Sequence, residues 1–147
     1  MNTPVPPPTD PGTSGSGVVE RLGFARDQVV QEFGYDSDVD DEFRFAVEDH
    51  TGTELEDEEY KDVADVSLIW WRQDDGDLVD AVVDALTKLG EGGSVVVLTL
   101  KSGRPGHVEA SDIEEAATTA GLHTSGTVNA CEDWTATKLV APKTGRR

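Results

Sequence analysis

Two segments of the chain are apolar at nearly every position instead of alternating between apolar and polar residues. They are 64–71 (ADVSLIWW) and 94–100 (SVVVLTL). Strands that are apolar on both faces belong in the middle of a sheet that helices cover on both sides. We therefore predict that the two segments are neighbouring central strands that run in the same direction, with Leu68 and Val96 in one sheet.

The segment between these strands, 77–93, has the period of an amphipathic helix. Its apolar stripe consists of Leu78, Val79, Val82, Val83, Leu86 and Leu89. Gly90, Gly92 and Gly93 follow the stripe, and glycine commonly ends a helix. A strand, a helix and a second strand in this order predict a right-handed βαβ unit with parallel strands.

Weaker patterns extend this unit toward the N-terminus. Residues 28–33 (QVVQEF) have the composition of a short strand. The next segment, 37–52, has helical spacing, with acids in its first turn and a glycine at its end. We expect a second short strand at 53–55 and an exposed acidic connection over 54–62.

Toward the C-terminus, Ser111 and Glu114 have capping-box spacing at the start of a helix that Gly121 would end. Residues 127–142 then read as an antiparallel hairpin. The predicted fold is a three-layer α/β/α sandwich with a mostly parallel, Rossmann-like sheet and this C-terminal antiparallel hairpin.

The ends of the chain differ from its middle. Residues 1–17 are rich in proline, glycine and serine and predict a disordered tail. Residues 18–143 form a single α/β domain in this interpretation, and 144–147 a short basic tail. We see no signal peptide and no apolar run of ~20 residues that could span a membrane. The sequence therefore favours a cytoplasmic protein.

The charge composition limits the classes of molecule that the protein can bind. The chain has 30 acidic and 12 basic residues and a net charge of -18. A field of this sign repels nucleic acid and anionic lipid. We expect neither as a partner and favour another protein or a small anionic metabolite, with a homodimer as a further possibility. The single cysteine, Cys131, excludes an intrachain disulfide and predicts an inert buried thiol.

The sequence does not match the known motifs for cofactor binding or for metal sites. The predicted first strand leads into FGYDSDVDDEF, which lacks the glycines of a dinucleotide site or a phosphate-binding loop. Asp36, Asp38 and Asp40 resemble the start of an EF-hand, but its required glycine and glutamate are replaced by Asp41 and Val47. The three histidines have no metal-ligand spacing. We therefore expect no catalytic residue, no cofactor and no metal.

One cluster of candidate residues remains. Ligands bind at the carboxyl ends of the strands of an open parallel sheet. The residues expected at this edge are Trp71, Arg72, Lys101, Arg104, His107 and, exposed at the hairpin turn, Trp134. They would bind an anionic ligand or a partner protein. Alternatively, the three basic residues only form ion pairs with Asp74, Asp75, Asp77 and Glu109.

Several long motifs, in order, resemble an actinobacterial family known as domain of unknown function 3052 (DUF3052). They are QVVQEFGYD, WWRQDDGDLVDAVVDAL, KSGRPGHVEASDIEEAA and DWTATKLVAPK. The resemblance implies an actinobacterial cytoplasm and a fold like the carboxyl half of Rossmann-like methyltransferases. In that half, 65–71 replaces the fourth strand and 92–100 the fifth. The glycine-rich loop for S-adenosylmethionine is missing.

Three functions fit these observations. The first is a non-catalytic binding or regulatory module that contacts a protein or a small anionic ligand at the carboxyl edge of the sheet. The second is a minimal or degenerate methyltransferase-like enzyme, with His107 as a general base. The third is a structural subunit that pairs with a second copy through the edge of its hairpin. The sequence favours the first and leaves the partner or ligand open.

Overall fold

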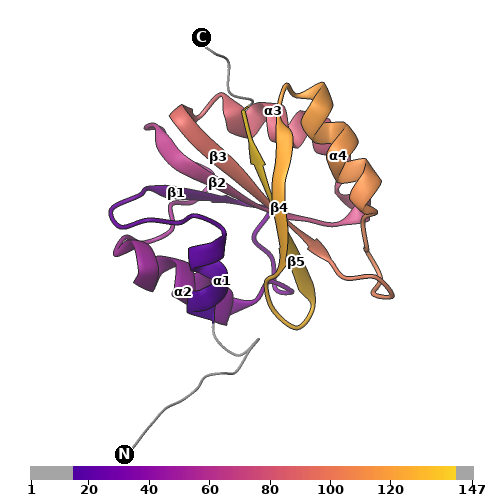
Figure 1. The fold of residues 1–147 in the computed structure, drawn as a ribbon, viewed down its shortest axis with the longest axis horizontal. Coiled ribbons are helices and arrows are strands. Elements are labelled where there is room, and N and C mark those ends of the chain that lie inside the picture. Colours follow the sequence, from indigo (N-terminus) through magenta and orange to yellow (C-terminus); the bar gives the residue numbers. More distant parts are fainter. Residues whose placement is uncertain (1–14, 142–147) are drawn as a thin grey trace, which may run out of the picture.

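Five strands form one mixed sheet in the order β1-β2-β3-β5-β4. The computed structural model describes residues 15–141 (Figure 1). The strands are β1 (Val30–Phe33), β2 (Ala64–Trp71), β3 (Leu89–Leu100), β4 (His123–Asn129) and β5 (Trp134–Val140). β1, β2 and β3 are parallel, whereas β5 is antiparallel to β3 and β4. The predicted C-terminal hairpin is confirmed.

The two uniformly apolar segments are the central strands, as predicted. Leu68 of β2 pairs with Val96 of β3, and both side chains are buried. Alternate residues of these strands face two separate apolar cores. Each central strand therefore needs apolar residues at both odd and even positions, which explains the missing alternation.

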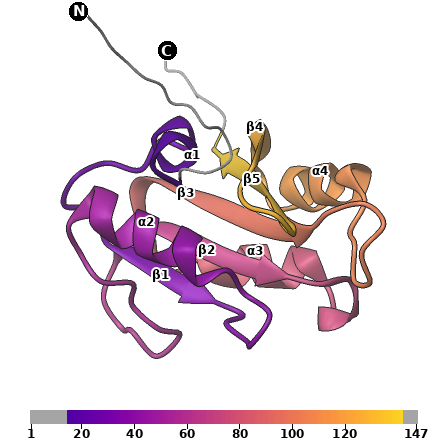
Figure 2. The ribbon, with the colours of Figure 1, turned by 90° about the horizontal axis from the view of Figure 1, so that it is seen from below.

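Helices cover both faces of the sheet (Figures 1 and 2). The helices are α1 (Gly15–Arg21), α2 (Asp41–Thr51), α3 (Leu78–Leu86) and α4 (Ala110–Thr119), with a short 3-10 turn at Gln73–Asp75. Residues of α1 and α2 belong to one core, and residues of α3 and α4 to the other. The predicted three-layer α/β/α sandwich is confirmed.

The helix between the central strands is shorter than its apolar stripe suggested. α3 ends at Leu86, and Leu89 already pairs with Ala64 as the first residue of β3. Val83, placed in the stripe, is 42% exposed. The glycines belong to the start of β3 and do not end the helix. A Cβ on Gly93 would lie 2.9 Å from the Asp65 carbonyl oxygen, so the close approach of the strands requires glycine there.

Two predicted local features are absent. α4 begins at Ala110, so Ser111 lies inside the helix, and the N-cap residue Glu109 makes no side-chain capping bond. The predicted capping box is therefore wrong. The predicted short strand at 53–55 is replaced by an isolated parallel bridge between Gln31 and Glu56.

Residues 1–14 and 142–147, which include most of the predicted tails, lie outside the described residues. The predicted N-terminal tail extends to residue 17, but the chain is already helical from Gly15. Val19 of α1 and Leu22 just after this helix are buried in the core shared with α2. Within residues 15–141, none of the helices combines the length and apolar character needed to cross a membrane.

Candidate functional site

The carboxyl ends of the three parallel strands lie at one edge of the sheet, as the sequence predicted. Loops leave this edge after Phe33 of β1, Trp71 of β2 and Leu100 of β3. The Gln73 backbone N–H donates to the Gly106 carbonyl, which joins the second and third loops. Arg72, Lys101, Arg104 and His107 therefore belong to neighbouring loops, whereas Trp71 ends β2 and Trp134 begins β5. The surroundings of these residues differ greatly.

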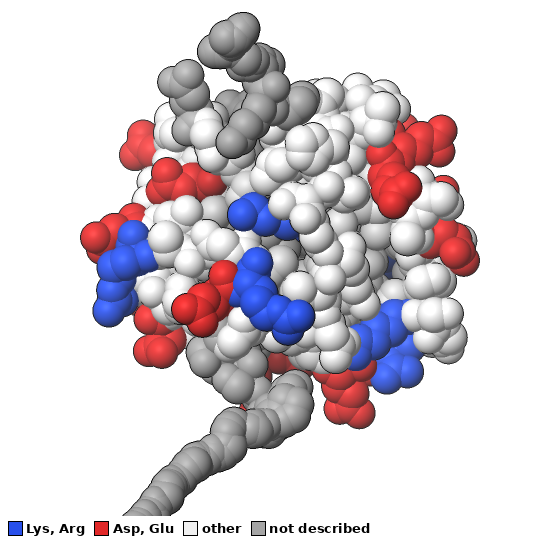
Figure 3. All heavy atoms as spheres, in the orientation of Figure 1, with Lys and Arg blue, Asp and Glu red and all other residues white. Residues whose placement is uncertain are grey.

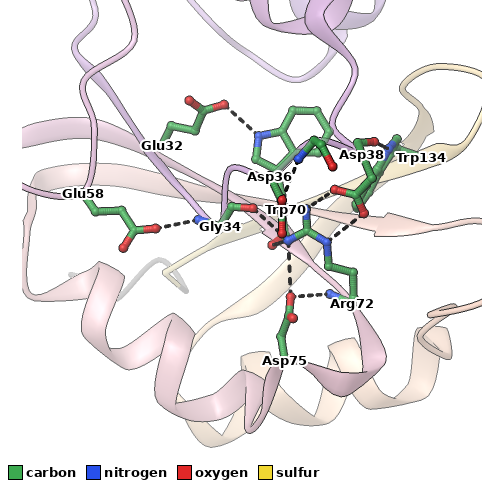
Figure 4. A network of polar contacts seen from close by, with 10 residues as sticks. Glu32, Gly34, Asp36, Asp38, Glu58, Trp70, Arg72, Asp75 and Trp134 are labelled. Atoms are coloured by element: carbon green, nitrogen blue, oxygen red, sulfur yellow. Dashed lines mark hydrogen bonds and ion pairs between the residues drawn. The ribbon is translucent and has the colours of Figure 1, made fainter.

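Arg72 is enclosed by groups of the chain itself (Figure 4). Its Nη1 donates to the carbonyl oxygens of Gly34 (2.8 Å) and Trp70 (3.0 Å) and to Asp75 Oδ2 (3.3 Å). Its Nε donates to Asp38 Oδ2 (3.1 Å), and Nη2 donates to Asp38 Oδ1. The side chain is 14% exposed. The hydrogen bonds of this guanidinium connect the loop after β1 to the end of β2.

Gly34 lies where the loop after β1 comes closest to the end of β2. Its φ is +79°, and a Cβ at this position would lie 2.3 Å from the Trp70 carbonyl oxygen. Only glycine combines this backbone conformation with the missing side chain. Gly34 N–H also donates to Glu58 Oε2 at 2.8 Å, so the connection 54–62 helps to fix the loop.

Two tryptophans support the same network from the apolar side. Trp134 packs edge-on against Trp70, with ring centroids 4.9 Å apart, and its indole N–H donates to the Asp38 carbonyl at 3.1 Å. The Arg72 guanidinium lies 5.3 Å from the centre of the Trp134 ring. Trp134 is only 1% exposed, so the prediction that it is exposed is wrong. Its position at a turn gave no information about what covers it.

The hydrogen bonds from Arg72 stabilise the ionised form of Asp38. They lower the pKa of this carboxyl from its ordinary value, against the opposing effect of burial. The predicted ion pair between Arg72 and Asp75 is confirmed, whereas the pairing with Asp38 was not anticipated. Asp38 is 34 residues away in sequence, and nothing local connects the two residues.

Arg104 and His107 also make hydrogen bonds and charge contacts with other residues of the chain. Arg104 Nε donates to Asp133 Oδ1 at 2.6 Å, in an exposed ion pair with the hairpin turn. His107 Nδ1 donates to the Leu100 carbonyl at 2.8 Å, because a carbonyl oxygen can only accept. Its Nε2 lies 3.6 Å from Glu109 Oε2. The loop between β3 and α4 is therefore folded back on the end of its own strand.

Lys101 differs from the other two basic residues. Its ammonium forms no ion pair with any residue in the described range 15–141. It lines a hollow of about 260 Å³ between the end of β3, the hairpin and α4. His107 and Glu114 are the other titratable side chains of this hollow. Its remaining polar groups are the hydroxyls of Ser102, Thr99, Thr124, Thr127, Thr135 and Thr137.

Trp71, the last predicted site residue, separates two further hollows. One, of about 540 Å³, lies between the first turn of α3 and α4. The other, of about 590 Å³, runs beside α3 and includes Phe33, Tyr35 and Arg72. Trp71 is largely buried and belongs to the core of α3 and α4, so only part of its indole faces each hollow.

The sequence analysis missed a second ion pair, which lies on the same face of the sheet as Trp70 and Trp134. Arg44 of α2 donates through Nε (2.7 Å) and Nη2 (2.9 Å) to the two carboxylate oxygens of Glu32. The indole of Trp70 donates to the same Glu32 at 2.8 Å. The hydrogen bonds that Arg44 donates to Glu32 raise the pKa of Arg44 above its ordinary value. A buried acid needs a partner of this kind. The acid within the predicted strand 28–33 was therefore the signal in the sequence for this ion pair.

Metal binding and thiol chemistry find no support in residues 15–141. Nowhere in this range do three histidine, cysteine or acidic side chains gather closely enough to hold a metal ion. Cys131 lies in the hairpin turn, where burial and the nearby Asp40 raise its pKa to about 12. Its thiol therefore stays protonated near neutral pH, in agreement with the predicted inert cysteine.

Comparison with known proteins identifies the family. The family model described as "Protein of unknown function (DUF3052)" matches residues 19–143. The chain belongs to the DUF3052 family. The resemblance stated from the sequence is thereby confirmed. Uncharacterized proteins of Mycobacterium tuberculosis and Mycobacterium bovis are 49% identical to this DUF3052 protein over 128 residues, which cover 87% of this chain and 80% of theirs.

Solved structures similar to this DUF3052 protein include methyltransferases. CalO1, a methyltransferase of calicheamicin biosynthesis, has a TM-score of 0.65 and 15% identity. The match covers 89% of this chain but only 54% of CalO1, so the chain spans about half of that protein. CcbJ from Streptomyces caelestis has a TM-score of 0.61 and 12% identity, with 90% and 91% coverage. At this identity the similarity shows a shared Rossmann-like fold and nothing about activity.

Proposed function

We propose that this DUF3052 protein is a non-catalytic binding module that takes a small anionic ligand in the hollow beside Lys101. The observation that carries the proposal is the contrast in pairing at the carboxyl edge. Arg72 and Arg104 form ion pairs with acids of the chain. Lys101 lines a hollow, and no acid of the described residues lies within ion-pair distance of its ammonium group.

The residues that line the hollow limit the chemical class of the ligand. One ammonium group is the only permanent positive charge there, and Glu114 stands on the helix opposite. This balance suits a single carboxylate better than a phosphate ester, which carries more charge. The remaining wall consists of threonine side chains and of Leu100, Val108 and Ile113, which offer methyl groups and hydroxyls. A short aliphatic or hydroxylated monocarboxylate matches both features.

The charge distribution of the surface supports access from the hairpin side. In Figure 3, acidic side chains lie mainly along the two sides of the view, while the middle, over β4 and β5, shows mostly uncharged side chains with basic ones beside them. An anion approaching a protein of net charge -18 meets the least repulsion over such a strip. The hydroxyls of Thr124 and Thr127 on β4 belong to this side of the hollow.

Thermal unfolding in a panel of ligands tests the proposal. The panel contains unbranched and hydroxylated monocarboxylates of two to six carbons, with inorganic phosphate for comparison. A ligand present at 100 times its Kd stabilises the folded state by about 2.7 kcal/mol, and the melting temperature rises accordingly. Lys101→Met should abolish the rise. Lys61→Met, which changes an exposed lysine in the 54–62 connection, should preserve it.

If no carboxylate raises the melting temperature of the wild-type protein, or if Lys101→Met responds like Lys61→Met, the proposal is wrong. The shared fold makes a degenerate methyltransferase the second candidate. Its support is weak, because the Arg72 network occupies the end of β1 and β2, where a parallel sheet commonly receives a ligand. Calorimetric titration with S-adenosylmethionine distinguishes the two, since heat of binding there would favour the methyltransferase.

A further inference from the structure

The α3 face of the sheet is incompletely covered at its β1 end. α3 contacts β2 and β3, and α4 contacts β4, whereas neither has an extensive contact with β1. The hollow of about 590 Å³ lies in this gap, along α3 from Asp75 to Lys88. Ala81 and Asp84 of α3 line the groove, together with Thr87 and Lys88 just after the helix. From Ala81 to Lys88 the rise is about 10 Å at 1.5 Å per residue, which is about two helical turns.

The floor of this groove is apolar and partly aromatic. Ile69 and Trp71 form its deep part, and Phe33 at the end of β1 is only half-buried. Tyr35 stands at the rim with 57% of its surface exposed. Ala81 of α3 is small and keeps the opposite wall open. The groove therefore offers a small apolar floor on which an apolar side chain of a partner can pack.

The rim of the groove is acidic. Asp36, Glu58 and Asp84 line it, against the single unpaired base Lys88, since Arg72 and Asp75 pair with each other. The occupant that matches this rim carries positive charge on both sides of an apolar stripe. A second copy of this chain does not match, because it has a net charge of -18.

The outer edge of β1 is already hydrogen-bonded, and this limits the form that an occupant of the groove can take. Glu32 N–H donates to the Glu56 carbonyl (2.7 Å), and Glu56 N–H donates to the Val30 carbonyl (2.9 Å). These bonds use the backbone groups that an incoming strand would need, so strand addition at β1 is blocked. A partner must instead bind through side chains, as an amphipathic helix in a groove does.

We propose that the groove between β1 and α3 binds a basic amphipathic helix of a partner protein. The apolar stripe of this helix packs on Phe33 and Ala81, and its lysine or arginine side chains contact Asp36, Glu58 and Asp84. This surface is distinct from the hollow beside Lys101, and no residue lines both. Binding in the groove therefore does not depend on the ligand proposed above.

A matched pair of charge changes on α3 tests the inference. Asp84 lines the groove, whereas Asp80, one turn earlier on the same helix, does not. The probe is a fluorescent 14-residue helical peptide of leucine and lysine with one apolar stripe, measured by anisotropy at 0.15 M salt. Asp84→Lys should weaken its binding about tenfold, and Asp80→Lys clearly less, because only Asp84 lines the groove that the peptide enters.

Two controls separate the groove from general attraction to an acidic protein. A peptide with serine in place of leucine should bind at least tenfold more weakly, since it cannot fill the apolar floor. Ala81→Trp, which fills the groove without changing charge, should also weaken the leucine peptide. Equal losses in Asp80→Lys and Asp84→Lys, equal binding of the serine peptide, or no measurable binding of the leucine peptide would overturn the inference.

Discussion

Arg72 and Lys101 follow neighbouring parallel strands, and in the sequence they look equivalent. Each is the first basic residue after a buried strand, and each stands at the edge where α/β proteins commonly bind ligands. In the structure, Arg72 makes hydrogen bonds to two carbonyls and two carboxylates, whereas Lys101 pairs with no acid of the described residues. Position at the edge is therefore not enough to predict a binding residue.

The difference arises from the loops that face each residue. The loop after β1 brings Gly34 and Asp38 onto Arg72, and the planar guanidinium can donate to all of them at once. The hairpin residues that line the hollow beside Lys101 are threonines, and Asp133, one of the two acids in the hairpin turn, pairs with Arg104. We infer that Arg72 stabilises the fold and that Lys101 is available to a ligand. The predictions below test this contrast, from the largest expected effect to the smallest.

The largest effect is expected for Arg72→Met. Methionine keeps part of the apolar stem but cannot donate to the carbonyls of Gly34 and Trp70 or to Asp38. The loss should be about 3 kcal/mol in the free energy of unfolding, measured by urea denaturation. Lys101→Met should change it by less than about 0.5 kcal/mol. Equal losses in the two variants would show that Arg72 and Lys101 have the same role.

A smaller loss is expected for Trp134→Phe. This variant removes the indole hydrogen bond to Asp38 and part of the edge-on contact with Trp70, at a cost of about 2 kcal/mol by the same assay. Trp71→Phe is the matched control, because the Trp71 indole makes no hydrogen bond within residues 15–141. If Trp71→Phe is as destabilising as Trp134→Phe, the tryptophan contributes through packing alone.

Asp38→Asn should act through pH. Because the folded-state pKa of Asp38 is lowered, its contribution is fully present above the unfolded value of about 3.9 and is lost as pH falls through the folded-state pKa. The variant should be less stable than wild type at pH 7, and the two stabilities should converge below about pH 4. Urea denaturation at several pH values measures this. A constant difference at all pH values would contradict the ion pair with Arg72.

The smallest loss is expected for Arg104→Ala. Its ion pair with Asp133 is exposed, and such pairs contribute less than about 1 kcal/mol. The variant also leaves the Asp133 carboxylate without its ion-pair partner. Asp133 is close to Lys101, because its backbone carbonyl accepts a hydrogen bond from the Lys101 N–H. We therefore expect weaker carboxylate binding beside Lys101 with almost unchanged stability, measured by the thermal shift described above. Strong destabilisation would place Arg104 with Arg72 as a structural residue.

The main features of the fold could be predicted because they depend on local patterns. The unbroken apolar runs identified β2 and β3, and helical spacing identified α2 and α3. The helix α4 was predicted from a capping-box spacing that the structure does not use and from Gly121 after its end. The errors lie where tertiary contacts decide. Leu89 has the spacing of the α3 stripe, but its pairing with Ala64 makes it part of β3. α1 was missed because its flanking residues have the composition of a flexible tail.

The site was less predictable because its contacts are distant in sequence. The edge location and the ion pair between Arg72 and Asp75 follow from strand order and local spacing. The contacts between Arg72 and Asp38, and between Trp134 and Asp38, join residues 34 and 96 positions apart. No periodic pattern reports such contacts. The hollow beside Lys101 arises only when the hairpin folds against β3 and α4.

A single NMR titration tests the contrast between the two basic residues most directly. The side-chain Nε–H of Arg72 and the Cε of Lys101 are observed while butyrate is added to the wild-type protein. The account predicts a slowly exchanging Arg72 Nε–H that does not shift, because Asp38 already accepts from it, and a saturable shift of Lys101. A rapidly exchanging Arg72 Nε–H that moves with butyrate, beside an unchanged Lys101, would contradict the account.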